Sequence, residues 1–348
     1  MAKSESAGKL NLSLIARESG VSKMTVSRVL RSESNVSPET RRAVLQVAER
    51  MGFVPSRPRR PRSDLGHYYI LFQQSYSVND AYFSGIILSI QNALFDHGCG
   101  CSFGIITEEY GDFVKLNALM KGREVSGVFV IGEIPARDAN MLLGSFSDII
   151  FIDYPGGSTL DYPYNAITTD NVYGGHQAVR HLLDLRRRRI LLLAGRQGHY
   201  FTNDLLRAYQ ETLAEYGMAF DPGLVRHGDF HTDSGYRQVA DALAEGLSFD
   251  AIFSNDEMAC GAMRALCEAG RSVPDEVSIV GFDGLPATRM VTPRLTTVAV
   301  DREKMGRLAV HRLLSFEEDS AVTAPYEKIS LFPKLIVRES TSEKRTAD

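Results

Sequence analysis

Short apolar runs alternate with amphipathic segments along most of this chain, from about residue 68 onward. The runs are typical of buried strands and cover residues 68–73, 101–106, 127–132, 149–153, 189–195, 251–255 and 277–283. Between them, apolar residues recur every three or four positions at residues 82–98, 171–185, 202–217 and 256–270, which predicts helices. Such alternation predicts an α/β body with parallel sheets covered by helices on both faces. About 270 residues of this pattern predict two lobes.

The start of the chain has a different pattern, which predicts three short helices. Asn11, Ser22 and Ser37 can each cap a helix. The helices then cover residues 12–19, residues 23–30 and a segment with Pro38 at its first position. The apolar faces are formed by Leu14, Ile15, Val21, Val26, Val29 and Leu30, and in the third helix by Val44, Leu45, Val47, Ala48 and Met51. Two helices joined at Gly20 and packed on a third describe an all-α helix-turn-helix head.

Charge separates the head from the body. The net charge of the 348-residue chain is −4, but its first 66 residues hold 13 Lys/Arg against 6 Asp/Glu. A basic head on an acidic body indicates that the head binds a polyanion.

Composition narrows the class of protein further. Apolar residues make up 44% and charged residues 24%, as in ordinary soluble proteins. We expect a cytoplasmic protein, because the sequence has neither a membrane-spanning apolar run nor the apolar core of a signal peptide. Cys99, Cys101, Cys260 and Cys267 lack metal or redox spacing and are expected to be buried, reduced thiols. The eight histidines also lack metal-ligand spacing, so no metal, cofactor or catalytic residue is predicted.

Several stretches together resemble the LacI/GalR family of transcriptional repressors. They are "GVSKMTVSRVL", "VSPETRRAVLQVAERMGFVP", "TDNVYGG", "FSNDEMACGAMRAL", "VSIVGFDG", "PRLTTVAVD" and "LIVRES", and they cover nearly the whole chain. The resemblance implies a homodimer, or a tetramer, that binds a pseudo-palindromic double-stranded DNA operator. It also implies a body like that of sugar-binding periplasmic proteins, with a small effector such as a sugar in the cleft between the lobes.

In the head, the second helix is predicted to enter the major groove. Lys23 and Met24 near its start face base edges, and Arg28 one turn later can reach a guanine with two donors. The short hydroxyl side chains that suit phosphate contacts are Ser22, Thr25 and Ser27. The alternative for Met24 is a partly buried position in the core of the head.

In the body, polar residues at strand ends are the candidate effector ligands, since open α/β sheets bind ligands outside the carboxyl ends of their strands. Asp153, Arg196, Asn255 and Asp283 end or follow predicted strands and suit a hydroxyl-rich molecule, while Tyr82 and Phe83 could stack on a ring. The family resemblance places the positions of Tyr82, Phe83, Asp153, Asn255 and Asp283 in the effector cleft. The alternatives are core packing for the two aromatic residues and helix or turn capping for Asp153, Asn255 and Asp283. Asp170 and Asn171 are interpreted as a helix start.

One departure from the family concerns the ligand. Members that bind sugars commonly carry an arginine at the position of Leu205, and Arg207 lies on a different face of the same predicted helix. Either Arg196 replaces that guanidinium, or the effector is not a simple sugar, or effector control is weak.

Two arginine-rich stretches need separate interpretations. In "RPRRPR", residues 57–62, Pro61 disfavours the hinge helix of the family, and Arg62 stands where the family has a leucine that enters the minor groove. We therefore predict an extended arm that places Arg57, Arg59, Arg60 and Arg62 on DNA, with Arg59, Arg60 and Arg62 in the minor groove. The alternative is a solvated tether. The run at residues 186–189 is interpreted as a solvated turn.

The expected domains are a helix-turn-helix head (1–54), an Arg/Pro linker (55–66), a two-lobed effector-binding and dimerisation domain (67–340) and a tail (341–348). Lobe 1 should comprise about 67–165 and 297–325, and lobe 2 about 166–296 and 326–340. The sequence therefore predicts a repressor switched by an effector. The rival functions are a cytoplasmic solute-binding protein and an enzyme on a βα scaffold, which the absence of a phosphate loop disfavours.

Overall fold

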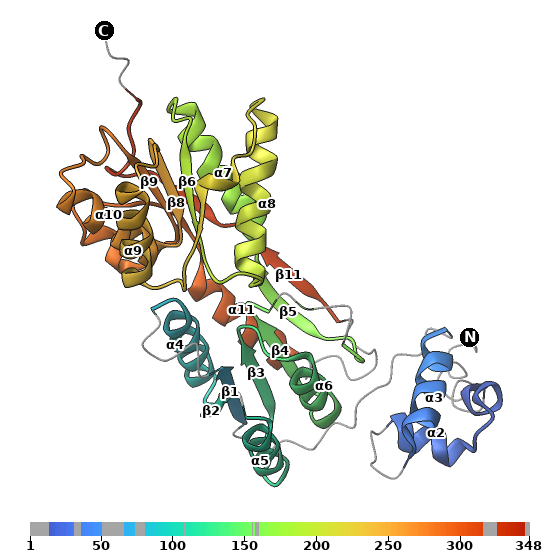
Figure 1. Ribbon diagram of the computed structural model, residues 1–348. Coiled ribbons are helices and arrows are strands. Elements are labelled where there is room, and N and C mark those ends of the chain that lie inside the picture. The colour runs from blue at the N-terminus through green and yellow to red at the C-terminus, as the bar shows by residue number, and fades with distance from the viewer. Residues whose placement is uncertain are drawn as a thin grey trace, which may run out of the picture. The chain divides into compact units, whose positions relative to one another are not determined.

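The computed structural model describes residues 14–30, 36–50, 66–73, 81–107, 109–154, 156, 160–315 and 326–344 (Figure 1). The chain divides into two compact units. Unit 1 holds residues 1–76, 90–166 and 308–327, and unit 2 holds residues 77–89, 167–307 and 328–348.

The head contains the three predicted helices. They are a helix at residues 14–19, α2 (Lys23–Leu30) and α3 (Pro38–Arg50). Two predicted caps are confirmed, because Ser22 Oγ accepts from the Thr25 N–H at 3.1 Å and Ser37 Oγ accepts from the Thr40 N–H at 3.2 Å. The core of the head is formed by Ile15, Ala16, Val26, Val29, Val44, Val47 and Ala48. Leu14 was expected inside but is exposed, and Asn11 and Met51 lie outside the described residues.

The first sheet has the strand order β11-β5-β4-β3-β1-β2. Its strands are β1 (His67–Gln73), β2 (Gly100–Ile106), β3 (Gly127–Ile131), β4 (Ile149–Ile152), β5 (Asn165–Thr169) and β11 (Lys328–Leu331). The helices of this part of the chain are α4 (Ala81–Asp96), α5 (Tyr110–Lys121), α6 (Ala136–Ser145) and α11 (Arg302–Ser315). Strands β2, β1, β3 and β4 run parallel, as their apolar runs predicted.

The second sheet has the strand order β12-β10-β9-β8-β6-β7. Its strands are β6 (Ile190–Ala194), β7 (Val225–His227), β8 (Ala251–Ser254), β9 (Ser278–Asp283), β10 (Thr296–Ala299) and β12 (Lys334–Ile336). The helices around it are α7 (Asn171–Asp184), α8 (Tyr200–Glu215), α9 (Thr232–Ala244) and α10 (Asp256–Glu268), with 3₁₀ turns at Pro222–Leu224 and Pro286–Arg289. All pairings among β7, β6, β8, β9 and β10 are parallel, and β12 is antiparallel.

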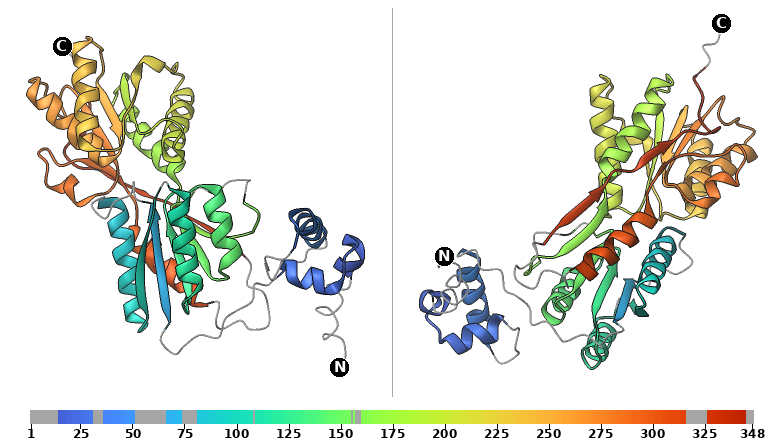
Figure 2. Two further views of the ribbon diagram at one scale, coloured as in Figure 1. Left: turned by 60° about the horizontal axis from the view of Figure 1, so that its bottom comes forward. Right: turned by 180° about the vertical axis from the view of Figure 1, so that it is seen from behind.

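Helices cover both faces of the second sheet, as the α/β pattern predicted. Helices α7 and α8 lie together on one face, and α9 and α10 lie together on the other (Figure 1; Figure 2 shows the same two layers from two more sides). Alternate residues of β6, such as Leu191 and Leu193, enter a core with α9 and α10. Asp170 caps α7 by accepting from the Tyr173 N–H at 2.9 Å, which confirms its interpretation as a helix start.

The arginine run at residues 186–189 is only partly the solvated turn that was expected. Arg186, Arg188 and Arg189 are exposed, but Arg187 has a relative exposure of 0%. The interpretation was wrong for Arg187 because its guanidinium finds carbonyl oxygens from three distant segments, which replace the water it loses.

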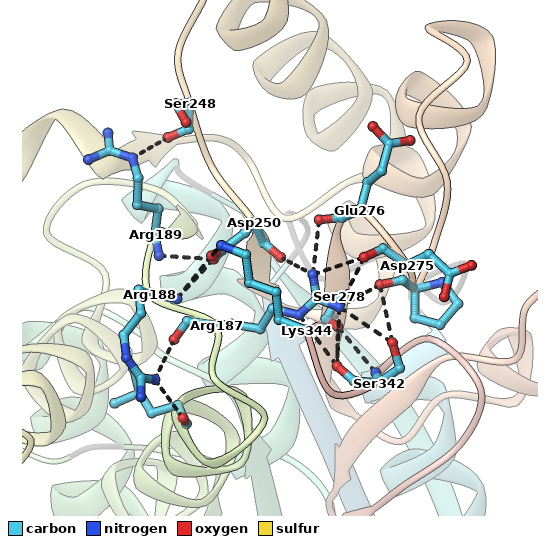
Figure 3. Close-up of polar contacts among 12 residues, drawn as sticks. Arg187, Arg188, Arg189, Ser248, Asp250, Asp275, Glu276, Ser278, Ser342 and Lys344 are labelled. Atoms are coloured by element: carbon cyan, nitrogen blue, oxygen red, sulfur yellow. Dashed lines mark hydrogen bonds and ion pairs between the residues drawn. The ribbon is translucent and has the colours of Figure 1, made fainter. Parts of the chain in front are cut away.

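The contacts of Arg187 connect the starts of three strands to the C-terminal segment (Figure 3). Its Nη1 donates to the Asp250 and Glu276 carbonyls at 3.3 and 3.0 Å, and its Nη2 donates to the Pro274 carbonyl at 2.8 Å. Both Nη atoms reach the Asp275 carbonyl at 3.2 Å, and Nε and Nη2 reach the Ser342 carbonyl at 3.4 and 3.2 Å. Burial lowers the pKa of Arg187, opposed by the nearby carboxylates of Asp250 and Asp275.

The Asp250 carboxylate completes this cluster. It accepts from the Arg188 and Arg189 backbone N–H groups at 2.9–3.1 Å and forms an ion pair with Lys344 Nζ at 2.8 Å. We call the Arg187 side chain, its carbonyl partners and the Asp250–Lys344 pair the Arg187 clamp. It stands at the amino ends of β6, β8 and β9, so it fixes how these strands begin.

The four cysteines are free, but they are less buried than the sequence suggested. Cys99, Cys101 and Cys260 are partly exposed and Cys267 is exposed. No helix in the described part of the chain is long and apolar enough to span a membrane.

Candidate DNA- and effector-binding sites

One face of α2 is available for DNA. Lys23, Met24 and Arg28 are exposed, while Val26 and Val29 are buried in the head. Met24 is 64% exposed, which excludes the alternative of a core position. The hydroxyls of Ser22 and Thr25 lie 2.9 Å apart and serve the helix cap, so these two residues have a structural role in addition to the phosphate contact predicted for them.

The remaining predicted DNA contacts cannot be placed. Arg57, Arg59, Arg60 and Arg62 lie outside the described residues, as does the side chain of Ser27.

Asn255 stands at the carboxyl end of β8 and at the N-cap position of α10. Its side chain makes no cap hydrogen bond, so the capping alternative holds only for its position. Instead, Nδ2 donates to the Phe230 carbonyl at 2.8 Å, and the buried Oδ1 has no hydrogen-bond partner among the described residues. That buried oxygen can accept a hydrogen bond from a ligand, because a buried acceptor is rarely left unpaired.

Aromatic side chains gather next to Asn255. The Phe230 ring lies 5.0 Å from His199 and 6.0 Å from Phe201, whose ring is 5.1 Å from Phe282. Phe230 has φ 77°, a conformation that non-glycine residues rarely adopt. Gly195 is needed opposite it, since a Cβ there would stand 1.7 Å from the ring.

Arg196 is exposed two residues after the end of β6 and three residues before His199. Burial, with a further contribution from Arg196, lowers the pKa of His199 to about 4, so this imidazole is neutral at pH 7. His199 Nδ1 accepts from the Phe201 N–H at 3.3 Å at the start of α8.

The loop that follows β9 carries Asp283. Asp283 has φ 109° and Gly284 has φ 70°, so the chain turns through two left-handed residues. Arg302 Nη1 donates to the Asp283 carbonyl, and its Nη2 donates to the Gly284 carbonyl at 3.2 Å. The same guanidinium lies 5.8 Å from the centre of the Tyr82 ring, which brings two predicted effector residues, Tyr82 and Asp283, to one arginine.

Asp256 lies beneath this loop with a relative exposure of 0%. Its Oδ1 accepts from the Thr297 hydroxyl at 2.6 Å and its Oδ2 accepts from the Leu285 N–H at 2.7 Å. Burial raises the pKa of Asp256 to about 7, although these hydrogen bonds and the charge of Arg302 lower it in part.

The other predicted residues are placed as follows. Phe83 is buried and packs edge-on against Tyr82, with ring centres 5.0 Å apart. Asp153 belongs to unit 1, where it is buried directly after β4 with φ 55°, whereas the other five candidates belong to unit 2. Leu205 is buried in α8, and Arg207 forms an exposed ion pair with Glu211 at 2.8 Å.

Sequence reasoning missed Phe230, His199, Asp256 and Arg302. Phe230 follows β7, a strand too short to predict, and Asp256 looked like an ordinary acidic residue in the first turn of a helix. A signal was present for Asp256, since a carboxyl next to Asn255 at a strand end fits the same rule that selected Asn255. No group of three or more His, Cys, Asp or Glu in the described residues could hold a metal ion.

Family models match two parts of the chain. Residues 11–56 match "Bacterial regulatory proteins, lacI family", and residues 179–341 match "Periplasmic binding protein-like domain".

Similar proteins extend this match over nearly the whole length. The chain is 32% identical over 339 residues to the HTH-type transcriptional regulator CelR of Thermobifida fusca, covering 94% of this chain and 97% of CelR. It is 30% identical over 334 residues to the HTH-type transcriptional repressor PurR of Haemophilus influenzae (strain PittEE), with 94% and 97% covered.

Solved structures agree with these relatives. A CelR–cellobiose complex has a TM-score of 0.69 at 30% identity and covers 94% of this chain and 99% of that one. A Lac repressor dimer bound to operator and the anti-inducer ONPF has a TM-score of 0.70 at 26% identity, with 94% and 98% covered.

The helix-turn-helix head and the α/β body define a DNA-binding transcriptional regulator. The chain belongs to the lacI family, as the resemblance in the sequence implied.

Proposed function

We propose that the protein is a dimeric repressor that binds a pseudo-palindromic operator through α2 and releases or tightens its hold on DNA when a saccharide binds the body. The observation that carries the DNA-binding part is the exposure of Lys23, Met24 and Arg28 on one face of a capped helix. Basic and apolar side chains on such a face can read base edges in the major groove.

The choice of a saccharide as the effector is supported by the polar groups at the strand ends. The free Oδ1 of Asn255, the carboxylate of Asp283 and the guanidinium of Arg196 supply acceptors and donors for hydroxyl groups. The Phe230 ring supplies an apolar face of the kind that stacks on sugar rings. A related regulator, CelR, forms a complex with cellobiose, so cellobiose is the first probe.

The dimer is supported by an exposed apolar surface in unit 1. Phe103 and Ile105 alternate along the edge strand β2 and so point to one side, and Phe95 near the end of α4 is 80% exposed. Exposed apolar edges invite pairing with another chain. We infer that a second copy covers Phe103 and Ile105. Sedimentation of the Phe103→Asp, Ile105→Asp double variant should then show monomer, whereas Phe332→Asp, at an exposed phenylalanine of unit 2, should stay dimeric.

The arginine arm at residues 57–62 keeps its sequence-based role in this proposal. Replacement of the arm by Gly/Ser of equal length should weaken operator binding and flatten its salt dependence by about 0.9 log unit per lost phosphate contact. Unchanged affinity and salt slope would identify the arm as a tether.

Fluorescence anisotropy on the promoter DNA of the protein's own gene tests the function as a whole. We expect salt-sensitive, sequence-specific binding that cellobiose changes. Arg28→Ala should relax discrimination at one base pair by about 1–3 kcal/mol, whereas Arg42→Ala, an exposed arginine of α3, should weaken all sequences equally. Binding without sequence preference in the wild type would contradict the proposal.

A further inference from the structure

The loop Asp283–Gly284–Leu285 needs outside support to keep its shape. Asp283 is an L-residue at φ 109°, and residues other than glycine rarely adopt a positive φ. Such a conformation persists only where the surroundings over-determine it. Two ionisable side chains that were not among the predicted site residues, Asp256 and Arg302, supply that support.

Asp256 holds the loop from inside through the backbone N–H groups of the loop itself. Its Oδ2 accepts from the Leu285 N–H at 2.7 Å. Its Oδ1 accepts from the Thr297 hydroxyl at 2.6 Å, and that same hydroxyl oxygen accepts from the Gly284 N–H at 3.3 Å. The donors to the two oxygens of this carboxylate are therefore a backbone N–H and a hydroxyl. The fit is close, because a Cβ on Gly281 would lie 2.1 Å from Oδ1.

Arg302 holds the same loop from the other side through the backbone carbonyl groups of the loop. Its two Nη atoms donate to the Asp283 and Gly284 carbonyls. The Val300 N–H donates to the Asp283 carbonyl at 3.2 Å, so that oxygen is held twice. The arginine also packs on α4, where a Cβ on Gly85 would stand 3.0 Å from its Nε and the Tyr82 ring centre lies 5.8 Å away.

These contacts join three candidate effector residues. Asp256 follows Asn255 directly at the start of α10, Arg302 contacts Tyr82, and both hold the loop that begins at Asp283. A carboxylate on the N–H side and a guanidinium on the C=O side of one loop fix its peptide groups in one orientation.

We propose that Asp256 and Arg302 are positioning residues of the effector response, which hold Asp283 and Tyr82 in the geometry that binds the ligand. The proposal rests on the saccharide site proposed above. It assigns these two residues no contact with the ligand and no role in DNA binding.

Isothermal titration with cellobiose, together with hydrogen exchange of the loop amides, tests this in the full-length protein. Asp256→Asn replaces one carboxylate oxygen by an NH₂ group facing a donor, and Arg302→Met removes both carbonyl contacts at similar length. Thr297→Val is a milder third variant, because valine suits a strand and only the hydroxyl contact is removed. It tests the proposal if Asp256→Asn does not fold. Arg187→Lys is the matched control, since it disturbs a buried charge at the opposite ends of the same strands.

We expect cellobiose affinity to fall at least 10-fold in Asp256→Asn and Arg302→Met, with operator affinity unchanged, and to stay within 2-fold of wild type in Arg187→Lys. The Leu285 amide should exchange faster in Asp256→Asn and Thr297→Val than in the control. Equal affinity losses in the control and the loop variants would overturn the proposal, because they would indicate general destabilisation. If the wild type does not bind cellobiose, the proposed effector is wrong. Hydrogen exchange then decides the positioning role alone, and unchanged Leu285 exchange in Asp256→Asn refutes it.

Discussion

Unit 2 buries one ionisable side chain at each end of strands β8 and β9, and the two side chains are held by opposite halves of the peptide group. Arg187 lies where β6, β8 and β9 begin and binds carbonyl oxygens. Asp256 lies where β8 and β9 end and binds a backbone N–H group and a hydroxyl. Neither has a directly bonded side chain of opposite charge among its described contacts. A buried charge is costly without such partners, so both charges order the backbone that surrounds them.

The difference between the two regions lies in what they order. The Arg187 clamp joins segments far apart in sequence, up to 155 residues for Ser342, and therefore closes the fold. Asp256 holds residues beside Asn255 and Asp283, and therefore shapes the candidate site. The charges also differ in permanence, since an arginine stays protonated in proteins whereas burial raises the pKa of Asp256 to about 7.

The largest expected effect comes from removing the guanidinium group of Arg187. Arg187→Met leaves several buried carbonyls unpaired, at about 1–3 kcal/mol for each unpaired group, so we expect a loss of about 4 kcal/mol in the free energy of unfolding. Calorimetry of the full-length protein measures it. Arg189→Met, in the same run but exposed, should change the stability by less than about 0.5 kcal/mol. Similar losses for the two variants would show that the clamp is not what stabilises unit 2.

The second test removes the C-terminal segment that contributes Ser342 and Lys344 to the clamp. A chain ending at Thr341 lacks the Ser342 carbonyl and the Lys344–Asp250 ion pair. The cost should be about 3 kcal/mol, somewhat below that of Arg187→Met, because the carbonyls of Pro274 and Glu276 keep their donor. In the shortened chain, Arg187→Met should cost less than in the full chain, and strict additivity of the two losses would contradict a shared cluster.

The third test uses the titration of Asp256. Its folded-state pKa of about 7 lies above the ordinary 3.8, so the folded protein binds more protons and stability falls as pH rises toward 7. The loss from pH 5.5 to 8 should be about 2 kcal/mol. His199 acts in the opposite direction, since its lowered pKa of about 4 makes stability rise with pH up to 6.5. Wild type and Asp256→Asn are therefore compared at each pH by calorimetry, and a constant difference between them would refute the titration.

The smallest effect concerns the residue before the clamp. Arg186 has φ 61° and forms an exposed ion pair with Glu343 at 3.2 Å. Glycine tolerates this φ without strain, while an exposed ion pair contributes little. Arg186→Gly should therefore stabilise the protein by about 0.5 kcal/mol, and Arg186→Ala, which keeps the unfavourable φ and loses the pair, should not. Equal thermal midpoints for the two variants would contradict this explanation.

The parts of the fold that the sequence predicted are those with local causes. The head helices begin at side chains that cap them, and the central strands are unbroken apolar runs such as residues 190–194. Strand β10 escaped prediction because its buried Thr296 and Thr297 look polar, although their hydroxyls are hydrogen-bonded inside the protein. Strand β5 is buried but carries Asn165, Thr168 and Thr169, so it lacks an apolar run. Strand β7 has only three residues, and β11 and β12 carry exposed residues.

In the candidate site, too, the sequence predicted only residues that are marked by a local property. The strand-end rule selected Asn255 and Asp283, because position at a strand end is a local property. Arg302 could not be selected, since its partners Tyr82 and Asp283 come from separate parts of the chain. Arg187 looked like its exposed neighbours in the run because its burial depends on carbonyls 63 to 155 residues away.

The span of the Arg187 clamp also sets an order for events during synthesis. Ser342 is added 155 residues after Arg187, which takes roughly 8–30 s at 5–20 residues per second. Strands β6, β8 and β9 are complete before Ser342 is added, while part of the partner set of the guanidinium has not yet been made. Unit 2 therefore lacks one of the three partner segments of Arg187 until Ser342 is made. Until then, water has to supply the hydrogen bonds that the Ser342 carbonyl provides in the folded protein.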